Sequence, residues 1–300
     1  MLTNIVLDSL VTGLPLAPLT LGVYVVFRIR QDFDLTVEGS FALGAAVAAV
    51  LLVAVVHPFL AVVAGALAGA AAGAVTAALH LGLGIPVLLA GLIMSIGLFS
   101  VTLHVLTGPT VGLAGAETIF TVLGVTGDAG QVLVLAALVA AVLGAFALFL
   151  RTELGLALRA SGAAPAMVRS QGVGDAQIVT LSLCLANLLA ALSGALLVQV
   201  QGFADVNLGI GMFVAAIGAV LLGTLAVRPS GSRVLRIVAA VVVGTLTYRL
   251  VLVAALRFGL PAADLKAITA LTLVAAVAVQ RYGAATLGRA EPALPAAVRQ

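Results

Sequence analysis

The feature that most constrains this fold is a series of apolar runs, each long enough to cross the hydrocarbon core of a membrane. About 20 residues suffice for one helical span, and such runs recur from one end of the 300-residue chain to the other. Their length and their richness in Ala, Leu and Gly favour helices, because backbone polar groups in lipid must be satisfied internally. We place nine runs at residues 5–27, 36–56, 59–80, 85–106, 131–150, 178–200, 207–227, 235–256 and 263–280.

The composition excludes a soluble protein. Hydrophobic residues make up 63% of the chain and charged residues only 8%, against about 25% charged in soluble domains. No polar segment is long enough to fold a separate domain. The sequence therefore predicts an all-α polytopic membrane protein with about 8–10 transmembrane helices, in which residues 1–300 form a single transmembrane domain.

The longest polar interruption, residues 151–177, orients the chain. If this loop is cytoplasmic, strict alternation of the spans places 11 of the 14 Lys and Arg residues on the same side, as expected for cytoplasmic loops. We therefore expect the N-terminus outside and a cytoplasmic tail at residues 281–300. The 11 residues are Arg28, Arg30, Arg151, Arg159, Arg169, Arg228, Arg233, Arg236, Arg281, Arg289 and Arg299.

The same loop has an internal pattern. A helix-like half at Gly155–Ala160 is followed by a break at Ser161–Pro165 and a second short helix-like half at Ala166–Gln171. A basic, structured loop between apolar segments indicates a docking surface for a partner. The alternative is an ordinary loop that its arginines hold in the cytoplasm.

Two polar stretches in the two halves of the chain resemble each other. The sequence reads RIRQDFDLTVEGSF around Asp34 and VQGFADVNLGIGMF around Asp205, and the predicted topology puts them on opposite sides of the membrane. Paired, Gly-interrupted polar segments are typical of an inverted repeat with broken helices, and coincidence is the alternative. The segment Asp34–Ser40 is then either a break inside the membrane, which shifts the count to eight or ten spans, or a cytoplasmic loop.

Small residues recur on the apolar runs at helical spacing. Gly65, Gly69 and Gly73 stand four residues apart, and Gly44 precedes Ala48 by the same interval. Such ridges let helices approach closely in lipid, so we expect a compact bundle.

The sequence holds no recognisable catalytic site. No Walker A motif occurs, and no histidine-carboxylate pattern with metal-ligand spacing is present, because His57, His80 and His104 are scattered over three segment ends. We expect no catalytic residue, no metal site and no cofactor bound by the chain itself. The net charge of +3 reflects arginines in loops and does not point to nucleic acid.

The chain also lacks the usual ionisable groups of an ion-coupled carrier. Its carboxylates fall in loops or at segment ends, and Arg249 is the charge placed well inside a span. Arg249 has three interpretations: binding of a substrate carboxylate, pairing with another helix, or snorkelling to an interface. A bundle without its own energy source, yet with a structured basic loop, suggests that the energy comes from a partner docked at that loop.

The loop resembles one in the permease subunits of bacterial ABC importers related to the branched-chain amino acid and ribose systems. In the segment GLALRASGAAPAMVRSQGV the residues on that pattern are Gly155, Arg159, Ala160, Gly162, Pro165 and Gly172, and Arg169 lies in the same loop. Residues 21–49, 84–101, 186–212 and 248–271 look like the tryptophan/tyrosine-type subgroup of these permeases, so the resemblance covers most of the chain.

The resemblance implies a type II-like ABC importer permease in the bacterial inner membrane, moving an amino-acid-like solute by alternating access. It also implies two cytoplasmic ATP-binding subunits that hold ATP and Mg, docked on a coupling helix in loop 151–177. A solute-binding protein would lie outside, and a second permease copy, identical or paired, would complete the path. Candidate pathway residues are Asp34, Thr36, Glu38, Asn187, Gln199, Gln201, Asn207 and Arg249. A stand-alone ion-coupled transporter and a membrane scaffold without transport are the alternatives.

Overall fold

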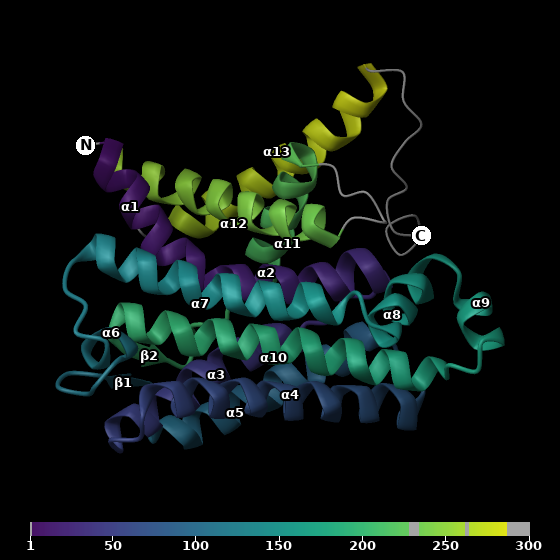
Figure 1. The fold of residues 1–300 in the computed structure, drawn as a ribbon, viewed down its shortest axis with the longest axis horizontal. Helices are drawn as coiled ribbons and strands as arrows, with labels where there is room; N and C mark the ends of the chain where they lie inside the picture. Colours follow the sequence, from purple (N-terminus) through teal and green to yellow (C-terminus); the bar gives the residue numbers. More distant parts are fainter. Residues whose placement is uncertain (1, 228–233, 262–263, 287–300) are drawn as a thin grey trace.

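A computed structural model describes residues 2–227, 234–261 and 264–286 of the chain. Long helices lie alongside one another in a bundle, with short elements gathered at its two ends (Figure 1). In chain order the elements are α1 (Leu2–Gly13), the 3-10 helix η1 (Leu14–Leu16), α2 (Ala17–Val23), the π-helix η2 (Tyr24–Arg30), α3 (Thr36–Val53), α4 (Pro58–Leu83), α5 (Val87–Leu106), β1 (Thr110–Gly112), α6 (Ile119–Val122), α7 (Asp128–Phe149), α8 (Glu153–Ala163), α9 (Pro165–Ser170), α10 (Asp175–Gln201), β2 (Phe203–Asp205), α11 (Met212–Ala226), α12 (Val234–Arg257) and α13 (Leu265–Thr286).

Each of the nine predicted apolar runs is helical. Within the described residues, seven helical segments are long and apolar enough to cross a membrane, and two shorter apolar helices lie in α11 and α13. The prediction of an all-α polytopic protein is therefore confirmed. One small sheet was not predicted: β1 pairs antiparallel with β2, with Thr110 opposite Asp205, and three-residue strands are too short to leave a periodic signal.

The first span changes helix type twice along its length. Pro15 and Pro18 cannot donate a backbone hydrogen bond and disturb the preceding turn, so the helix tightens into η1 and its axis bends between α1 and α2 (Figure 1). The hydroxyl of Ser193 on α10 donates to the Pro15 carbonyl. The span ends at Gln31, whose φ of 64° is left-handed and stops the helix.

Helix α10 packs along α3 and α4 through a seam of small residues. A Cβ on Gly44 would lie 2.2 Å from the Ala191 carbonyl oxygen, and a Cβ on Gly73 would lie 2.5 Å from the Leu183 carbonyl oxygen. Only glycine allows backbones to approach so closely. The glycine ridges expected from the sequence therefore lie where helices are in contact.

The chain breaks inside the bundle before α3. Residues 31–35 are not helical, and the Asp34 side chain is fully buried and hydrogen-bonded to Asn187. Asn187 stands near the middle of α10, about 18 Å from its first residue at 1.5 Å per residue. The break therefore lies within the bundle at residues 31–35, and most of the predicted segment Asp34–Ser40 belongs to α3 instead. It does not change the number of apolar helices, because α3 resumes at Thr36.

The connecting segments gather at two ends as alternating spans require. The end of η2, the short helices α8 and α9 and the first turn of α10 lie at one end of the bundle, whereas α6, β1 and β2 lie at the other (Figure 1). Four arginines of the orientation argument, Arg228, Arg233, Arg289 and Arg299, fall outside the described residues, as does the tail beyond residue 286.

We predict that Gly73→Val destabilises the protein, because the new side chain meets the backbone of α10. Overpacking of this kind costs about 1–3 kcal/mol or more, so the melting temperature in detergent, followed by size-exclusion chromatography after heating, should fall. Gly144→Val on α7 is the matched control, since no atom lies within 4 Å of a Cβ built there. Equal melting temperatures for the two variants would contradict the packing described here.

Candidate functional site

The centre of the candidate site is the buried carboxylate of Asp34. Its Oδ1 accepts the backbone N–H of Thr36 at 2.9 Å, and its Oδ2 accepts the Asn187 side-chain amide at 2.7 Å. Asn187 in turn accepts the Ser40 hydroxyl at 2.7 Å. All four residues are fully buried. In a membrane such a group persists only where protein atoms replace water, so this network is what allows the chain to break here.

Two neighbouring helices complete the enclosure of the break. The hydroxyl groups of Thr36 and Thr76 lie 2.9 Å apart, which joins the start of α3 to α4. On the other side, a Cβ on Gly91 of α5 would lie 2.8 Å from Asp34 Oδ1 and 2.8 Å from the Leu35 nitrogen. Elements α3, α4, α5 and α10 therefore all meet at the break.

The segment that leads into α11 contacts α3 at Glu38, about one turn after the break at residues 31–35. Glu38 Oε1 accepts the backbone N–H of Gly211 at 3.0 Å, immediately before α11. A Cβ on Gly209 would lie 1.9 Å from the Glu38 carbonyl oxygen. Before α11, Asp205 Oδ1 accepts the N–H of Asn207 at 2.7 Å, which is the two-residue turn that Asp34 makes before α3. The two stretches that resemble each other in sequence thus share this aspartate turn, although Asp34 stands directly before α3 whereas Asp205 ends β2 and is separated from α11 by a further turn.

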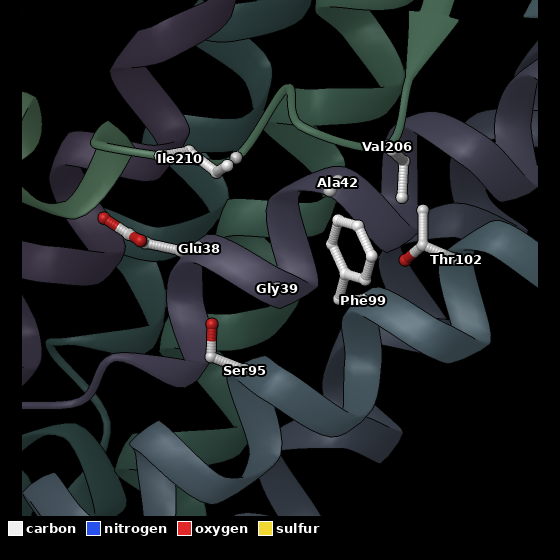
Figure 2. Close-up of a pocket in the computed structure, with 9 residues that line it drawn as sticks. Glu38, Gly39, Ala42, Ser95, Phe99, Thr102, Val206 and Ile210 are labelled. Atoms are coloured by element: carbon white, nitrogen blue, oxygen red, sulfur yellow. The ribbon is translucent and has the colours of Figure 1, made fainter. Parts of the chain in front are cut away.

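A small cavity lies between α3, α5 and the segment that precedes α11 (Figure 2). Its volume is about 40 Å³. Since one water needs about 10–15 Å³ by this measure, the cavity has room for two or three waters and not for a whole amino acid. It is lined by Glu38, Gly39, Ala42, Ser95, Phe99, Thr102, Val206, Gly209 and Ile210.

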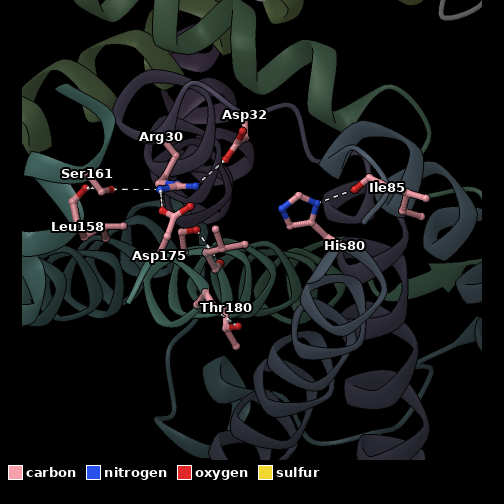
Figure 3. Close-up of polar contacts among 11 residues, drawn as sticks. Arg30, Asp32, His80, Ile85, Leu158, Ser161, Asp175 and Thr180 are labelled. Atoms are coloured by element: carbon pink, nitrogen blue, oxygen red, sulfur yellow. Dashed lines mark hydrogen bonds and ion pairs between the residues drawn. The ribbon is translucent and has the colours of Figure 1, made fainter. Parts of the chain in front are cut away.

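At the end of the bundle that holds α8, Arg30 connects three elements (Figure 3). Its guanidinium lies 3.4 Å from Asp32 in the loop that leads to Asp34, 3.3 Å from Asp175 at the start of α10, and 3.4 Å from the Ser161 hydroxyl on α8. Burial raises the pKa of Asp32, and the neighbouring Arg30 partly opposes that rise. Arg30 is mostly buried, whereas its partner Asp175 is half exposed, so solvent screens the contact with Asp175 more than the contact with Asp32.

The loop at residues 151–177 folds into two short helices, as the sequence predicts, but the break between them is Ala164 alone and not Ser161–Pro165. Helix α8 lies directly on the end of η2: a Cβ on Gly162 would lie 1.6 Å from the Ile29 carbonyl oxygen. The outer surface of the pair is apolar and basic. Leu156 is 58% exposed and Met167 is 62% exposed, and Arg169 is exposed beside them.

The other residues of the loop pattern divide between packing and surface. Gly155 is buried against the end of α7, where a Cβ would lie 2.2 Å from the Phe149 carbonyl oxygen. Arg159 and Ala160 are half-buried. Pro165 and Gly172 are exposed: the proline begins α9 and the glycine, with φ of 81°, follows its end.

The remaining predicted pathway residues lie away from the break. Gln199 is buried near the far end of α10, where its Oε1 accepts the backbone N–H of Ile119 at 2.8 Å and holds the start of α6. Gln201 and Asn207 belong to the same end of the bundle. Arg249 is half-buried on α12 and its Nε donates to Thr12 of α1 at 2.8 Å. Of its three interpretations, pairing with another helix is the one this contact supports.

Several residues that the sequence did not single out belong to the site. Arg30 was used only for orientation, and its partners Ser161 and Asp175 lie 131 and 145 residues further along the chain. Thr76 lies within a ridge of small residues, where only its hydroxyl distinguishes it. For Thr102 the sole sequence signal is a polar residue within an apolar run.

We predict that Asn187→Leu destabilises the protein by about 1–3 kcal/mol or more, because it leaves Oδ2 of the buried Asp34 carboxylate without a donor. The melting temperature in detergent should fall by about 2–4 °C per kcal/mol. Thr180→Val on the same helix is the control, since that hydroxyl lies near the surface and bonds only its own helix. An unchanged melting temperature for Asn187→Leu would show that the network does not stabilise the break.

Comparison with known proteins gives relatives that match nearly the whole chain. It is 30% identical to the tyrosine transport system permease protein of Clostridioides difficile (strain R20291) over 273 residues, which cover 91% of this chain and 90% of the relative. It is also 30% identical to the uncharacterized protein RP368 of Rickettsia prowazekii (strain Madrid E) over 274 residues, which cover 90% of this chain and 95% of the relative. No solved structure matches the chain significantly.

Residues 5–279 match the family described as branched-chain amino acid transport system / permease component. The match begins in α1 and ends in α13, so it includes the break at Asp34, the pair α8–α9 and the break before α11. The resemblance inferred from the loop pattern is therefore confirmed, and the chain is a multi-pass membrane protein that belongs to the branched-chain amino acid transport system permease family.

Proposed function

We propose that this chain is the permease subunit of an ATP-driven importer that carries an amino-acid-like solute across the bacterial inner membrane by alternating access. The name of the relative from Clostridioides difficile, a tyrosine transport system permease, supports an amino acid as the solute. In this proposal the chain itself performs no catalysis, and ATP and Mg are held by the partner subunits.

The observation that carries the proposal is the contact between α8 and the broken first span. Gly162 of α8 lies on the backbone of Ile29, and Ser161 of α8 contacts Arg30. Arg30 also contacts Asp32, two residues before the buried Asp34. A displacement of α8 by a docked partner would therefore act directly on the loop at residues 31–35, where the first span is already interrupted.

The partners follow from this arrangement. The exposed apolar and basic surface of α8 and α9 suits a cytoplasmic ABC ATP-binding subunit, so we assign this end to the cytoplasm and the N-terminus to the outside. The end with β1, β2 and α6 then faces the extracytoplasmic solute-binding protein. A second permease copy, identical in the simplest case, would complete the translocation path.

We predict that Met167→Glu weakens docking of the ATP-binding subunit at least about tenfold. Burial of a methionine contributes about 1.5–3 kcal/mol, and each 1.4 kcal/mol is tenfold in affinity. Co-purification of the two subunits at increasing salt measures the effect. Thr110→Glu, an equally exposed site at the other end of the bundle, is the control. Unchanged co-purification of Met167→Glu would count against α9 as the docking surface.

The loop arginines offer a second, charge-based test of the same surface. Arg169→Glu reverses an exposed charge and should also weaken docking, with a stronger effect at low salt. Arg159→Glu should disrupt the complex as well, but Arg159 is half-buried, so its variant must first be shown to fold.

We predict that Arg30→Met separates ATP hydrolysis from transport. Without the guanidinium, α8 loses its polar link to the loop at residues 31–35 and to α10. In proteoliposomes that contain the complete importer, we expect normal co-purification of the ATP-binding subunit but several-fold less solute imported per ATP hydrolysed. Arg28→Met, two residues earlier on η2 and with no ion pair among the described residues, is the control. Equal import per ATP in both variants would remove Arg30 from the mechanism.

A stand-alone ion-coupled carrier is the second candidate, and Asp34 is the observation that favours it. Carboxylates buried at mid-membrane mark ion pathways in such carriers, and Asp34 forms no ion pair within the described part of the chain. The two functions separate in one experiment: vesicles that contain this chain alone, with a proton or sodium gradient and no ATP. Solute uptake there would favour the carrier and contradict the importer.

A further inference from the structure

The cavity between α3 and α5 has one charged and two neutral polar positions along its length (Figure 2). Glu38 and Ser95 lie at one end, and Thr102 lies at the other beside Phe99. Ser95, Phe99 and Thr102 follow one face of α5 at helical spacing, so the groove extends about 10 Å along that helix. It lies beside the two broken helices, close to the level of Asn187.

Thr102 points to a ligand. The residue is fully buried, and its hydroxyl has no hydrogen-bond partner among the described residues. Other threonines within helices, such as Thr20, Thr76 and Thr245, donate to the carbonyl four residues earlier. The Thr102 hydroxyl instead faces the cavity beside the Phe99 ring (Figure 2). A buried polar atom without a partner is costly, and a polar group on a bound solute would satisfy it.

The Glu38 carboxylate at the other end of the cavity determines which charge a ligand can carry there. One backbone N–H at the start of α3 already bonds the Asp34 carboxylate, and one immediately before α11 already bonds Glu38. No Lys, Arg or His lines the cavity. The half-buried Glu38 carboxylate thus leaves a net negative end, which suits an ammonium group because a buried charge requires a partner.

We propose that this groove is a solute subsite, in which Glu38 binds the ammonium group of an amino acid and Thr102 bonds a polar group at the tip of its side chain. Phe99, 44% exposed, supplies an apolar surface between the two ends. An amino acid with a long, mainly apolar side chain and a polar tip, such as tyrosine, has this distribution of groups. The inference rests on the proposed transport function and specifies the solute class.

The groove is closed around this site in the present conformation. Its volume of about 40 Å³ is too small for an amino acid, and a Cβ on Gly39 would lie 2.9 Å from the Leu98 Cβ across the α3–α5 contact. Binding therefore requires α5 to move away from α3. Much of α5 faces outward, so this movement separates mainly the contact between α3 and α5.

The test measures protection of a cysteine placed in the groove and needs neither ATP hydrolysis nor a solute-binding protein. Cys184→Ser removes the free cysteine of the described chain, and Ser95→Cys introduces one in the groove. The rate at which a maleimide labels the purified permease is measured in the presence of L-tyrosine, tyramine or 3-(4-hydroxyphenyl)propionate at millimolar concentration. Tyrosine and tyramine should slow labelling several-fold, whereas the propionate, which lacks the ammonium group, should not.

Two variants distinguish recognition from structure. Glu38→Gln keeps an acceptor for Gly211 but removes the charge. Its melting temperature should therefore equal that of the parent, but about tenfold more ligand should be needed for the same protection. Thr102→Val should weaken protection by tyramine but not by phenethylamine, which lacks the hydroxyl. Gly97→Cys, at a site on α5 with no atom within 4 Å of a Cβ, is the labelling control and should not respond.

The outcomes distinguish a failure of the subsite from a failure of the proposed transport function. Absence of protection by both tyrosine and tyramine, equal protection by the propionate, or protection that survives Glu38→Gln would overturn the subsite. If Glu38→Gln unfolds, the Thr102→Val comparison decides, and an equal effect on tyramine and phenethylamine overturns it. Protection without ATP-dependent uptake by the complete importer would leave the subsite standing and contradict the proposed function.

Discussion

The hydrogen bonds of Asp34 are the interaction on which the rest of the structure depends. A helix that stops within hydrocarbon exposes backbone groups that lipid cannot satisfy, so a break at this depth needs polar partners from the protein. Asp34 bonds the first turn of α3, and Asn187 brings α10 to the same point. The small residues of α4 and α10 then allow the backbones to close around the network. The glycine contacts and the hydrogen bonds of Asp34 therefore stabilise the break together.

The same constraint applies to the second break and brings the two together. The segment before α11 repeats the aspartate turn of the segment before α3, and Glu38 then bonds the N–H of Gly211 at the start of α11. Because α3 supplies that carboxylate, α3 and the start of α11 are in direct contact. A bundle with this arrangement has its most deformable backbone and its polar side chains in one region, which is where a transported solute requires both.

The sequence predicts the helices well because the bilayer imposes their length and composition. Each apolar run became a helix, and the loop at residues 151–177 became the expected pair of short helices. The resemblance also gave Asp34, Thr36, Glu38 and Asn187 as candidate pathway residues, and these four lie together at the break. The sequence could not identify Arg30 as a connector, since Ser161 and Asp175 are distant in the chain and surface loops hold many arginines. Nor could it show that Thr102 faces a cavity, because that depends on which face of α5 packs against α3.

The position of these contacts explains how one small movement can reach the solute. Residues 31–35 join Arg30, which contacts α8, to Thr36, the first residue of α3. Helix α3 carries both Ser40, which bonds Asn187, and Glu38, and it forms one wall of the cavity whose other wall is α5. A shift of the loop must therefore either break the Asp34 network or move α3 with it. Since breaking the network exposes a buried carboxylate, movement of α3 is the less costly response, and the cavity between α3 and α5 changes width as a result.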